Sequence, residues 1–308
     1  MFTKLSISVE KVFTTVLACL LTAGCVSSQK FPDTDIVYQT GTPNSPQIGF
    51  VNADGSNNVV MKVDSYSAKP VWSVDGKTLY ALRWSGAGVS SGYISAWQEG
   101  RVIHVCQNWR AIASIGGIIL KADSIQAVVD NAGYQLLLID LDHCREVKRY
   151  VDTGQDQSRG VWGVSLSLDG KHILYAEEFD RQSISPQYSI KIMDLDTEGT
   201  IEIGEGVNPI WSPDNKFIAY ARFDGIYVMA SNGSQNRRIV TYDASDGTGN
   251  RIISPREPSP RWSSDGRWLV YHKCVQFQLA CSIFKTEVAT DKEVKIVDDG
   301  LYPFWRSR

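Results

Sequence analysis

A short motif recurs along this chain, and its repetition constrains the fold more than any other feature. The clearest copy is Trp211-Ser212-Pro213-Asp214, and the other copies keep an apolar residue, a small or polar linker and the aspartate. The aspartates of successive copies lie 45 to 51 residues apart, at Asp75, Asp123, Asp169, Asp214 and Asp265. A period of this length indicates an array of equivalent units, each of which buries its apolar face only against a neighbour.

Each copy predicts a strand, a tight turn and a second strand. Asp-Gly or Asp-Asn supplies turn residues that tolerate a left-handed backbone, so the repeated aspartates are expected to bond local backbone. Apolar residues then recur at alternate positions, as in Ile218 and Tyr220, which is strand spacing. A further apolar strand with a polar turn lies between copies, for example at residues 226–233. With helical periodicity absent, the repeat is a four-stranded antiparallel meander and the fold class is all-β.

The two ends of the chain complete each other. Pro303 and Trp305 match Pro209 and Trp211, and they begin a copy that stops before its turn. Residues 36–38 match residues 218–220 and supply the missing strands. We therefore predict a six-bladed β-propeller, closed by one blade that is shared between the N- and C-termini. In the most degenerate copy, residues 120–123 are expected to take the place of the Trp-Ser-x-Asp motif.

The first residues have the anatomy of an export signal. A basic start and the apolar run at residues 12–22, too short to span a bilayer, precede small residues and Cys25. This segment resembles the lipobox of bacterial lipoproteins, which implies cleavage before Cys25 and acylation of its thiol. Cys19 is a competing match that would leave a very short apolar segment, and an ordinary secretory signal is the alternative.

The predicted organisation is a signal peptide at residues 1–24, a lipidated tether at 25–33 and the propeller at 34–308. Val26 follows the cysteine, and resemblance to the Gram-negative sorting pattern then implies the periplasmic side of the outer membrane. Several acyl chains would anchor the protein without a transmembrane helix.

The repeat resembles that of the TolB-type β-propellers over nearly all of residues 34–308. The resemblance rests on the Pro-x-Trp-Ser-x-Asp-Gly unit and on the Asn-Ala-Asp-Gly-Ser hairpin at residues 52–56. TolB itself has an additional N-terminal domain, for which residues 25–33 leave no room. The resemblance therefore implies the fold and does not carry over the role of TolB.

Four cysteines of the mature chain would face an oxidising compartment, where an even count suggests disulfides. Cys274 and Cys281 are expected to pair across a hairpin, while Cys106 with Cys144 follows only by elimination. A Cys₂His₂ site that combines Cys106 and Cys144 with the neighbouring His104 and His143 is the alternative. We predict no metal site and no cofactor.

Charge excludes one class of partner. The formal net charge is -3, and the lysines and arginines are scattered, so there is no basic footprint for nucleic acid.

Long connections are expected on one rim of the propeller, opposite the tight Asp-Gly turns, at residues 83–93, 176–188, 242–259 and 272–280. Loops carried by a rigid scaffold usually bear recognition, so this long-loop rim is the predicted functional face. Its aromatic and arginine residues are the predicted partner contacts. They are Trp84, Tyr93, Phe179, Arg181, Tyr188, Tyr242, Arg251 and Arg256.

The predicted function is a protein-binding or scaffold module for envelope proteins, without catalysis. Residues 88–92 match Gly-x-Ser-x-Gly, but no helix follows and the context of a hydrolase is missing. The alternative is a propeller that binds a small ligand, carbohydrate or metal, or a lyase or hydrolase with its site at the channel mouth. An enzyme should gather ionisable groups with shifted pKa values there, and a scaffold should expose an apolar, aromatic patch.

Overall fold

The computed structural model describes residues 31–42, 45–61, 67–84, 92–99, 101–106, 112–120, 125–131, 134–153, 159–179, 187–242, 259–274 and 281–307. Every regular element in these ranges is a β-strand. Within the same ranges, no helix has the length and apolar character needed to cross a membrane.

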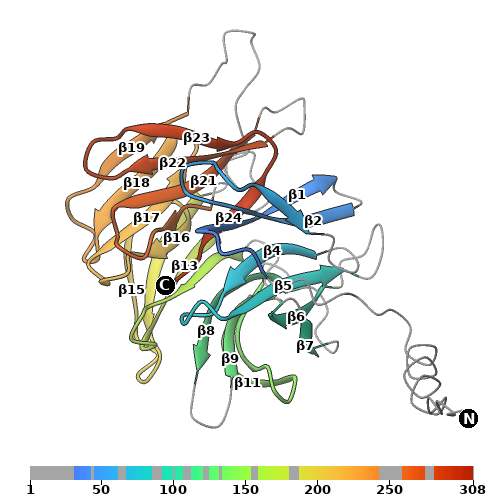
Figure 1. The fold of residues 1–308 in the computed structure, drawn as a ribbon. Coiled ribbons are helices and arrows are strands. Elements are labelled where there is room, and N and C mark those ends of the chain that lie inside the picture. The colour runs from blue at the N-terminus through green and yellow to red at the C-terminus, as the bar shows by residue number, and fades with distance from the viewer. Residues whose placement is uncertain are drawn as a thin grey trace, which may run out of the picture.

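The described strands form six four-stranded antiparallel sheets, which are the blades of a propeller (Figure 1). From the channel outward, blade 1 contains β4 (Ser67–Trp72), β5 (Thr78–Trp84), β6 (Gly92–Gln98) and β7 (Arg101–Cys106). Blade 2 contains β8 (Ile112–Leu120), β9 (Ile125–Asn131), β10 (Gln135–Asp140) and β11 (Arg145–Asp152). Blade 3 contains β12 (Gly160–Leu166), β13 (His172–Phe179), β14 (Gln187–Asp194) and β15 (Thr200–Glu205). Blade 4 contains β16 (Val207–Trp211), β17 (Phe217–Arg222), β18 (Gly225–Ala230) and β19 (Arg237–Thr241). Blade 5 contains β20 (Arg261–Trp262), β21 (Trp268–Cys274), β22 (Cys281–Glu287) and β23 (Glu293–Val297).

The sixth sheet, here called the shared blade, joins the two ends of the chain. It consists of β24 (Leu301–Trp305), β1 (Ile36–Thr42), β2 (Ser45–Val51) and β3 (Val59–Met61). Strand β24 pairs with β1 in the register Ile36↔Trp305, and the two strands lie side by side in Figure 1. The backbone N–H of Arg306 also donates to the carbonyl of Asp35 at 2.7 Å. The predicted six-bladed fold and its closure are confirmed.

The Ser-x-Asp turns have one geometry in four blades, as the repeat predicted. In blade 4 the Ser212 hydroxyl donates to Asp214 Oδ1 at 2.6 Å and accepts from the Phe217 N–H at 2.9 Å. Asp214 Oδ1 also accepts from the Lys216 N–H at 3.1 Å. Ser73, Ser167 and Ser263 repeat these contacts. The motif thus closes each turn with local side-chain bonds, which explains why it recurs.

The prediction for the degenerate copy is wrong by two residues. Trp72 pairs with Leu79 in blade 1, and the residue that pairs with the equivalent Ala127 in blade 2 is Ile118. The position expected for Leu120 is therefore filled by Ile118, because the β8–β9 ladder continues for two more residues, to the pair Leu120↔Ile125.

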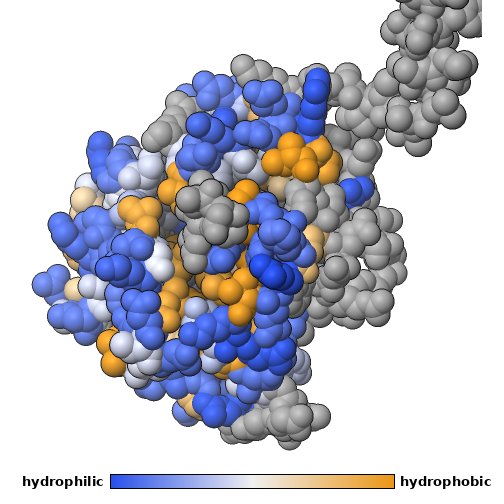
Figure 2. All heavy atoms as spheres, turned by 90° about the horizontal axis from the view of Figure 1, so that it is seen from below, coloured by the Kyte–Doolittle hydropathy of each residue, from blue (hydrophilic) through white to orange (hydrophobic). Residues whose placement is uncertain are grey.

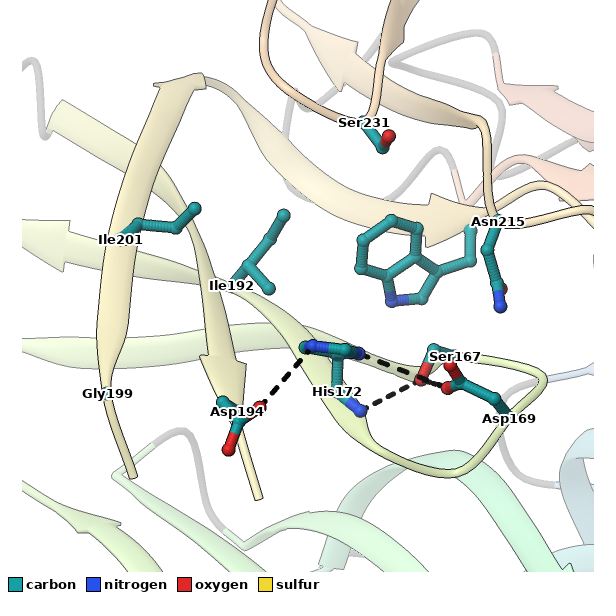
Figure 3. Close-up of a pocket in the computed structure, with 10 residues that line it drawn as sticks. Ser167, Asp169, His172, Ile192, Asp194, Gly199, Ile201, Asn215 and Ser231 are labelled. Carbon is teal, nitrogen blue, oxygen red and sulfur yellow. Dashed lines mark hydrogen bonds and ion pairs between the residues drawn. The ribbon is translucent and has the colours of Figure 1, made fainter. Parts of the chain in front are cut away.

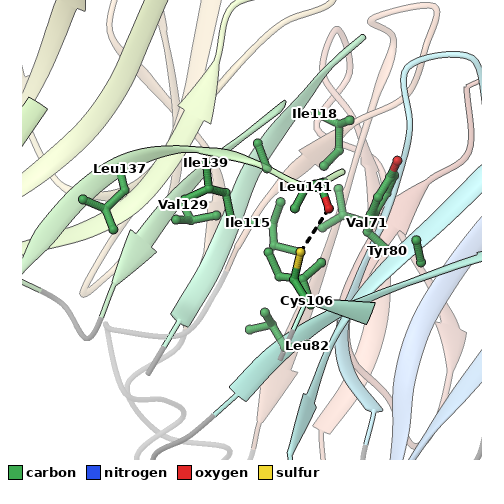
Figure 4. Packing of buried hydrophobic residues seen from close by; sticks show 13 residues of the cluster. Val71, Tyr80, Leu82, Cys106, Ile115, Ile118, Val129, Leu137, Ile139 and Leu141 are labelled. Carbon is green, nitrogen blue, oxygen red and sulfur yellow. Dashed lines mark hydrogen bonds between the residues drawn. The ribbon is translucent and has the colours of Figure 1, made fainter. Parts of the chain in front are cut away.

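The apolar core is divided into six clusters, and each cluster fills the space between two neighbouring blades. The cluster of blades 1 and 2 places Tyr80 and Leu82 against Ile115 and Ile139 (Figure 4). A corresponding cluster between blade 5 and the shared blade includes Ile36. Since every interface has its own core, no blade buries its apolar face alone.

Both predicted disulfides are present. Cys274 pairs with Cys281 between β21 and β22, inside blade 5. Cys106 at the end of β7 pairs with Cys144 beyond β10, so this bond joins blades 1 and 2. Because both sulfur atoms are in a disulfide, the Cys₂His₂ hypothesis is wrong. Among the described residues, no group of three or more His, Cys, Asp or Glu could hold a metal ion.

Candidate functional site

The channel opens at the rim of the Ser-x-Asp turns into a cavity of about 640 Å³, here called the channel pocket. Its walls come from the innermost strands of all six blades and the turns that follow them. Aromatic and aliphatic side chains dominate the lining, which includes Trp72, Ile118, Leu166, Trp211, Trp262, Phe304 and Trp305. Figure 2 shows one face of the molecule, on which hydrophobic residues gather near the middle and hydrophilic residues surround them.

The repeat itself builds the aromatic wall, because four copies place a tryptophan at the end of the innermost strand. Trp262 donates its indole N–H to the carbonyl of Ile210 at 3.3 Å. The indole nitrogens of Trp72, Trp211 and Trp305 are buried and have no hydrogen-bond partner among the described residues. A buried donor without an acceptor costs about 1–3 kcal/mol, and because these nitrogens are closed off from the channel pocket, a ligand there could not reach them without a rearrangement.

Two arginines line the channel pocket, and Arg261 is the one without an ion pair among the described residues. The other, Arg306, lies 3.7 Å from Asp33 Oδ1 and donates to the carbonyl of Gly76 at 3.0 Å. Arg261 occupies the position next to Trp262, where the other blades carry Val71, Gly117, Ser165, Ile210 or Phe304. Its guanidinium donates to the carbonyl of Pro260 at 3.2 Å and lies 5.6 Å from the centre of the Phe304 ring. It forms no ion pair within the part of the chain that the structure describes, and burial lowers its pKa to about 10. The side chain therefore stays protonated at neutral pH as an uncompensated positive charge.

A bulge in the innermost strands lies three residues before the tryptophan position. Its residue has a left-handed backbone in four blades: Lys69 (φ 50°), Gly163 (φ 54°), Asn208 (φ 51°) and Tyr302 (φ 47°). In three of them proline follows, and since proline has no N–H to pair, it fits beside a bulge. The bulge turns the strand and re-aims the side chains beyond it toward the channel mouth.

At two of these bulges the backbone N–H does not pair with the neighbouring strand. It donates instead to a polar side chain of the preceding blade. Gln39 Oε1 accepts from the Lys69 N–H at 3.2 Å, and His272 Nδ1 accepts from the Tyr302 N–H at 3.4 Å. Gln39 and His272 occupy the same repeat position, three residues after Ile36 and Leu269.

His272 is a buried neutral imidazole. It is 1% exposed, its Nε2 has no hydrogen-bond partner in the part of the chain that the structure describes, and the Tyr302 ring stands edge-on to it. Burial, together with the charges of Lys69 and Arg261, lowers its pKa to about 3. Shifted pKa values thus accompany an aromatic wall in this region, and both features that were expected to separate an enzyme from a scaffold are present.

Carboxylates stand at the outer edge of the channel pocket. Asp169 and Asp75 line it, and each is bound by the serine of its own turn. The hydrogen bonds from Ser167 and the Lys171 N–H hold the pKa of Asp169 below its usual range. Arg261 therefore lies within the channel, and these two carboxylates lie at its edge.

The eight residues predicted for the long-loop rim are only partly covered by the description. Arg181, Arg251 and Arg256 lie outside the described residues, as does Cys25. Trp84 and Tyr93 belong to β5 and β6, and their side chains also lie outside the description.

The other three predicted contacts, Phe179, Tyr188 and Tyr242, are described. Phe179 is a strand residue under the cations of Arg159 and Lys191. Tyr188 donates to Glu178 Oε1 at 3.0 Å, and Tyr242 is only 5% exposed. Strands β13 and β14 extend into the predicted loop, so Phe179 and Tyr188 pack on blade 3, and Tyr242 is buried directly after β19.

Sequence reasoning missed Arg261 and the bulges. The motif Pro-x-Trp-Ser was visible in the chain, and an arginine at its variable position is the one signal that could have drawn attention to the channel.

No protein-family profile matches the chain, and no curated protein matches it in sequence. Solved structures do resemble it in fold. A chain of a nidogen–laminin complex aligns with a TM-score of 0.61 at 10% identity, over 89% of this chain and 99% of that one. An oligogalacturonate lyase from Vibrio parahaemolyticus aligns with a TM-score of 0.50 at 15% identity, over 86% and 73% of the two chains. A candidate 6-phosphogluconolactonase from Bacteroides fragilis aligns with a TM-score of 0.50 at 13% identity, over 92% and 99%.

These likenesses concern the fold alone, but they correct one prediction. The expectation that this chain is not an enzyme is wrong as a deduction from its architecture, because propellers of this kind include an oligogalacturonate lyase. A four-stranded propeller array is thus compatible with catalysis.

Proposed function

We propose that this chain binds a small, anionic, ring-shaped molecule in the channel pocket. The observation that carries the proposal is Arg261, a half-buried guanidinium without an acidic partner in the described residues, set in an aromatic wall. A carboxylate or phosphate would supply the missing charge and form charge-assisted hydrogen bonds.

An acidic sugar is the ligand class that fits best. Its ring has apolar faces for the aromatic wall, and its carboxylate is an acceptor for the guanidinium of Arg261. The cavity of about 640 Å³ is large enough for a sugar ring. One of the solved structures of similar fold is an oligogalacturonate lyase, and oligogalacturonate is a polymer of such sugars.

Calorimetric titration with glucuronate, and with glucose as the neutral counterpart, tests this proposal. Glucuronate should bind, and Arg261→Met should weaken its affinity by about 10- to 100-fold, the value of one charged hydrogen bond. Glucose should bind weakly to both proteins. Equal affinity for the two sugars, or an Arg261→Met protein that binds as well as the parent, would overturn the proposal.

The cellular setting belongs to the same proposal. A lipid on Cys25 would hold the propeller at the periplasmic side of the outer membrane of a Gram-negative bacterium, as the signal resemblance implies. Labelling of cells with an alkynyl fatty acid tests this point: the parent should carry the label in the outer-membrane fraction. Cys25→Ser should lose the label, whereas Cys19→Ser should keep it.

A protein partner on the long-loop rim is the second candidate function. Phe223, between β17 and β18 on that rim, is 79% exposed, and a large exposed aromatic residue favours a protein contact. The nidogen–laminin chain of similar fold comes from a protein complex. Affinity capture from envelope extract should retain a protein on the Cys25→Ser domain and lose it with Phe223→Ser, Arg251→Ala and Arg256→Ala. Identical sets of retained proteins would count against this function.

A further inference from the structure

A second cavity, of about 380 Å³, lies between blades 3 and 4 beside the channel pocket (Figure 3). We call it the side pocket. Ser167, Asp169 and Trp211 line both cavities, so a ligand in one is in reach of the other. The remaining walls of the side pocket are aliphatic side chains of blade 3 and polar groups of both blades. They are His172, Ile192, Asp194, Gly199, Ile201, Asn215 and Ser231.

In the side pocket, the contacts of His172 with its two neighbouring carboxylates are loose. His172 lies between two carboxylates, with Nδ1 4.0 Å from Asp169 Oδ1 and Nε2 3.6 Å from Asp194 Oδ2. All three side chains are between 37% and 46% exposed, and ion pairs of this kind are weak. They can therefore exchange their mutual contacts for hydrogen bonds to a ligand.

The equivalent groove between blades 4 and 5 is built differently, which shows that the side pocket is not a necessary result of the repeat. Phe217 takes the place of His172, and it pairs with Ala230 where His172 pairs with Asp194. The charged groups there are paired: Arg267 bonds Glu287 at 3.2 Å. The imidazole between two carboxylates is thus particular to blade 3.

Charge and hydrogen bonding distinguish the side pocket from the channel pocket. Local hydrogen bonds, from Ser167 to Asp169 and from the Thr197 N–H to Asp194, lower the pKa of both carboxyls, so both are ionised at neutral pH. A second anion would be repelled. Asn215, Ser231 and the imidazole add donors to these acceptors, and a mixed set of donors and acceptors suits hydroxyl groups. Trp211, Ile192 and Ile201 provide an apolar wall for a ring face.

From this geometry we propose that the ligand has two sugar rings, an acidic ring in the channel pocket and a neutral, hydroxyl-rich ring in the side pocket. The inference rests on the proposed function of the channel pocket and specifies its ligand. It assigns Trp211 to the boundary between the two rings, and it assigns His172 and Asp194 to hydrogen bonds with the neutral ring.

Calorimetry with three probes tests the inference: glucuronate, β1,4-linked glucuronate–glucose and β1,4-linked diglucuronate. The glucuronate–glucose disaccharide should bind about 10-fold more tightly than glucuronate, the value of one or two neutral hydrogen bonds. Diglucuronate should gain nothing over glucuronate. In His172→Phe, which introduces the residue that blade 4 has at this position, the ratio between disaccharide and glucuronate affinities should fall to about one.

The reciprocal substitution Phe217→His is the matched control. It changes the equivalent groove, which lacks a counterpart of Asp194, and should leave the 10-fold ratio as in the parent. If glucuronate binds through Arg261 but the disaccharide binds no better, or His172→Phe keeps the ratio, the second ring is refuted and the channel proposal stands. If glucuronate itself fails to bind, the channel proposal fails and the side-pocket inference fails with it.

Discussion

His272 and Gln39 show how one side chain can support a neighbouring blade. Each accepts the N–H that a bulge of the next innermost strand releases, yet only the imidazole can titrate. The pKa of His272 is about 3 in the folded protein, against 6.5 for an ordinary histidine. The folded state therefore binds fewer protons than the unfolded state between these values, and stability falls as the pH falls from 6.5 toward 3.

Replacing His272 with Gln, the residue of the shared blade at this position, should remove that part of the acid sensitivity. A single group of this kind contributes up to about 1.4 kcal/mol for each pH unit within its window. Urea unfolding of the parent and of His272→Gln at pH 7.5 and pH 4.5 measures the effect. Between pH 7.5 and pH 4.5 the free energy of unfolding should fall less in the variant than in the parent, even if the two proteins differ in stability at pH 7.5. Parallel losses in the two proteins would contradict the role given to His272.

At the scale of the strand, the bulges of β12 and β16 explain a demand for glycine. Gly163 has φ +54°, and a Cβ there would lie 2.4 Å from the Cα of Asn208 in the next blade. Gly163→Ala should therefore cost about 2 kcal/mol or more, through backbone strain and overpacking together. Gly170→Ala is its control, since Gly170 also has positive φ, +70°, but no atom of a described residue lies within 4 Å of its Cβ position. Urea midpoints should rank Gly163→Ala well below Gly170→Ala; the reverse order would exclude close packing as the cause.

The two disulfides should differ in their contribution to stability. Cys106–Cys144 spans 38 residues and joins blades 1 and 2, whereas Cys274–Cys281 spans 7 residues within one blade. Loop-closure entropy predicts a loss of about 4 kcal/mol for the first and about 2 kcal/mol for the second. Paired Cys→Ala variants, compared by urea unfolding, test the ranking. A reductant should destabilise the parent but leave a variant without either disulfide unchanged; a larger loss from the short loop would contradict the entropic account.

The same elements show what the sequence could predict. The Trp-Ser-x-Asp copies carry their own hydrogen bonds, so turns, strands and blade number could be predicted from local residues such as Ser212 and Asp214. The channel pocket could not be predicted in this way, because Arg261 becomes part of a pocket only when the innermost strands of all six blades are assembled around it. The register of β8 was also missed, since pairing between strands, not motif spacing, places Ile118 at the channel.

At the scale of the whole molecule, ring closure depends on a blade made from both ends of the chain. Each of the six interfaces between blades is bridged by the chain itself, and the shared blade is held together by the β24–β1 ladder. The ring can therefore open in only two ways. Either the β24–β1 ladder breaks, or two blades that the chain connects covalently move apart. This arrangement leaves no sheet edge exposed at the closure.

A circular permutant tests this view of closure. Joining the present ends by a short linker and cutting within residues 62–66 would make the shared blade continuous, but one interface, between the shared blade and blade 1, would then be held by side-chain packing alone. A second permutant with the same linker, cut between Phe223 and Asp224, divides blade 4 between the new ends and so keeps a shared blade. Both should give the β-rich circular dichroism of the parent. In urea, the first should unfold at a lower concentration than the second, because its ring can open without breaking a ladder. Equal midpoints would mean that packing between blades closes the ring unaided, and that the shared blade adds nothing to stability.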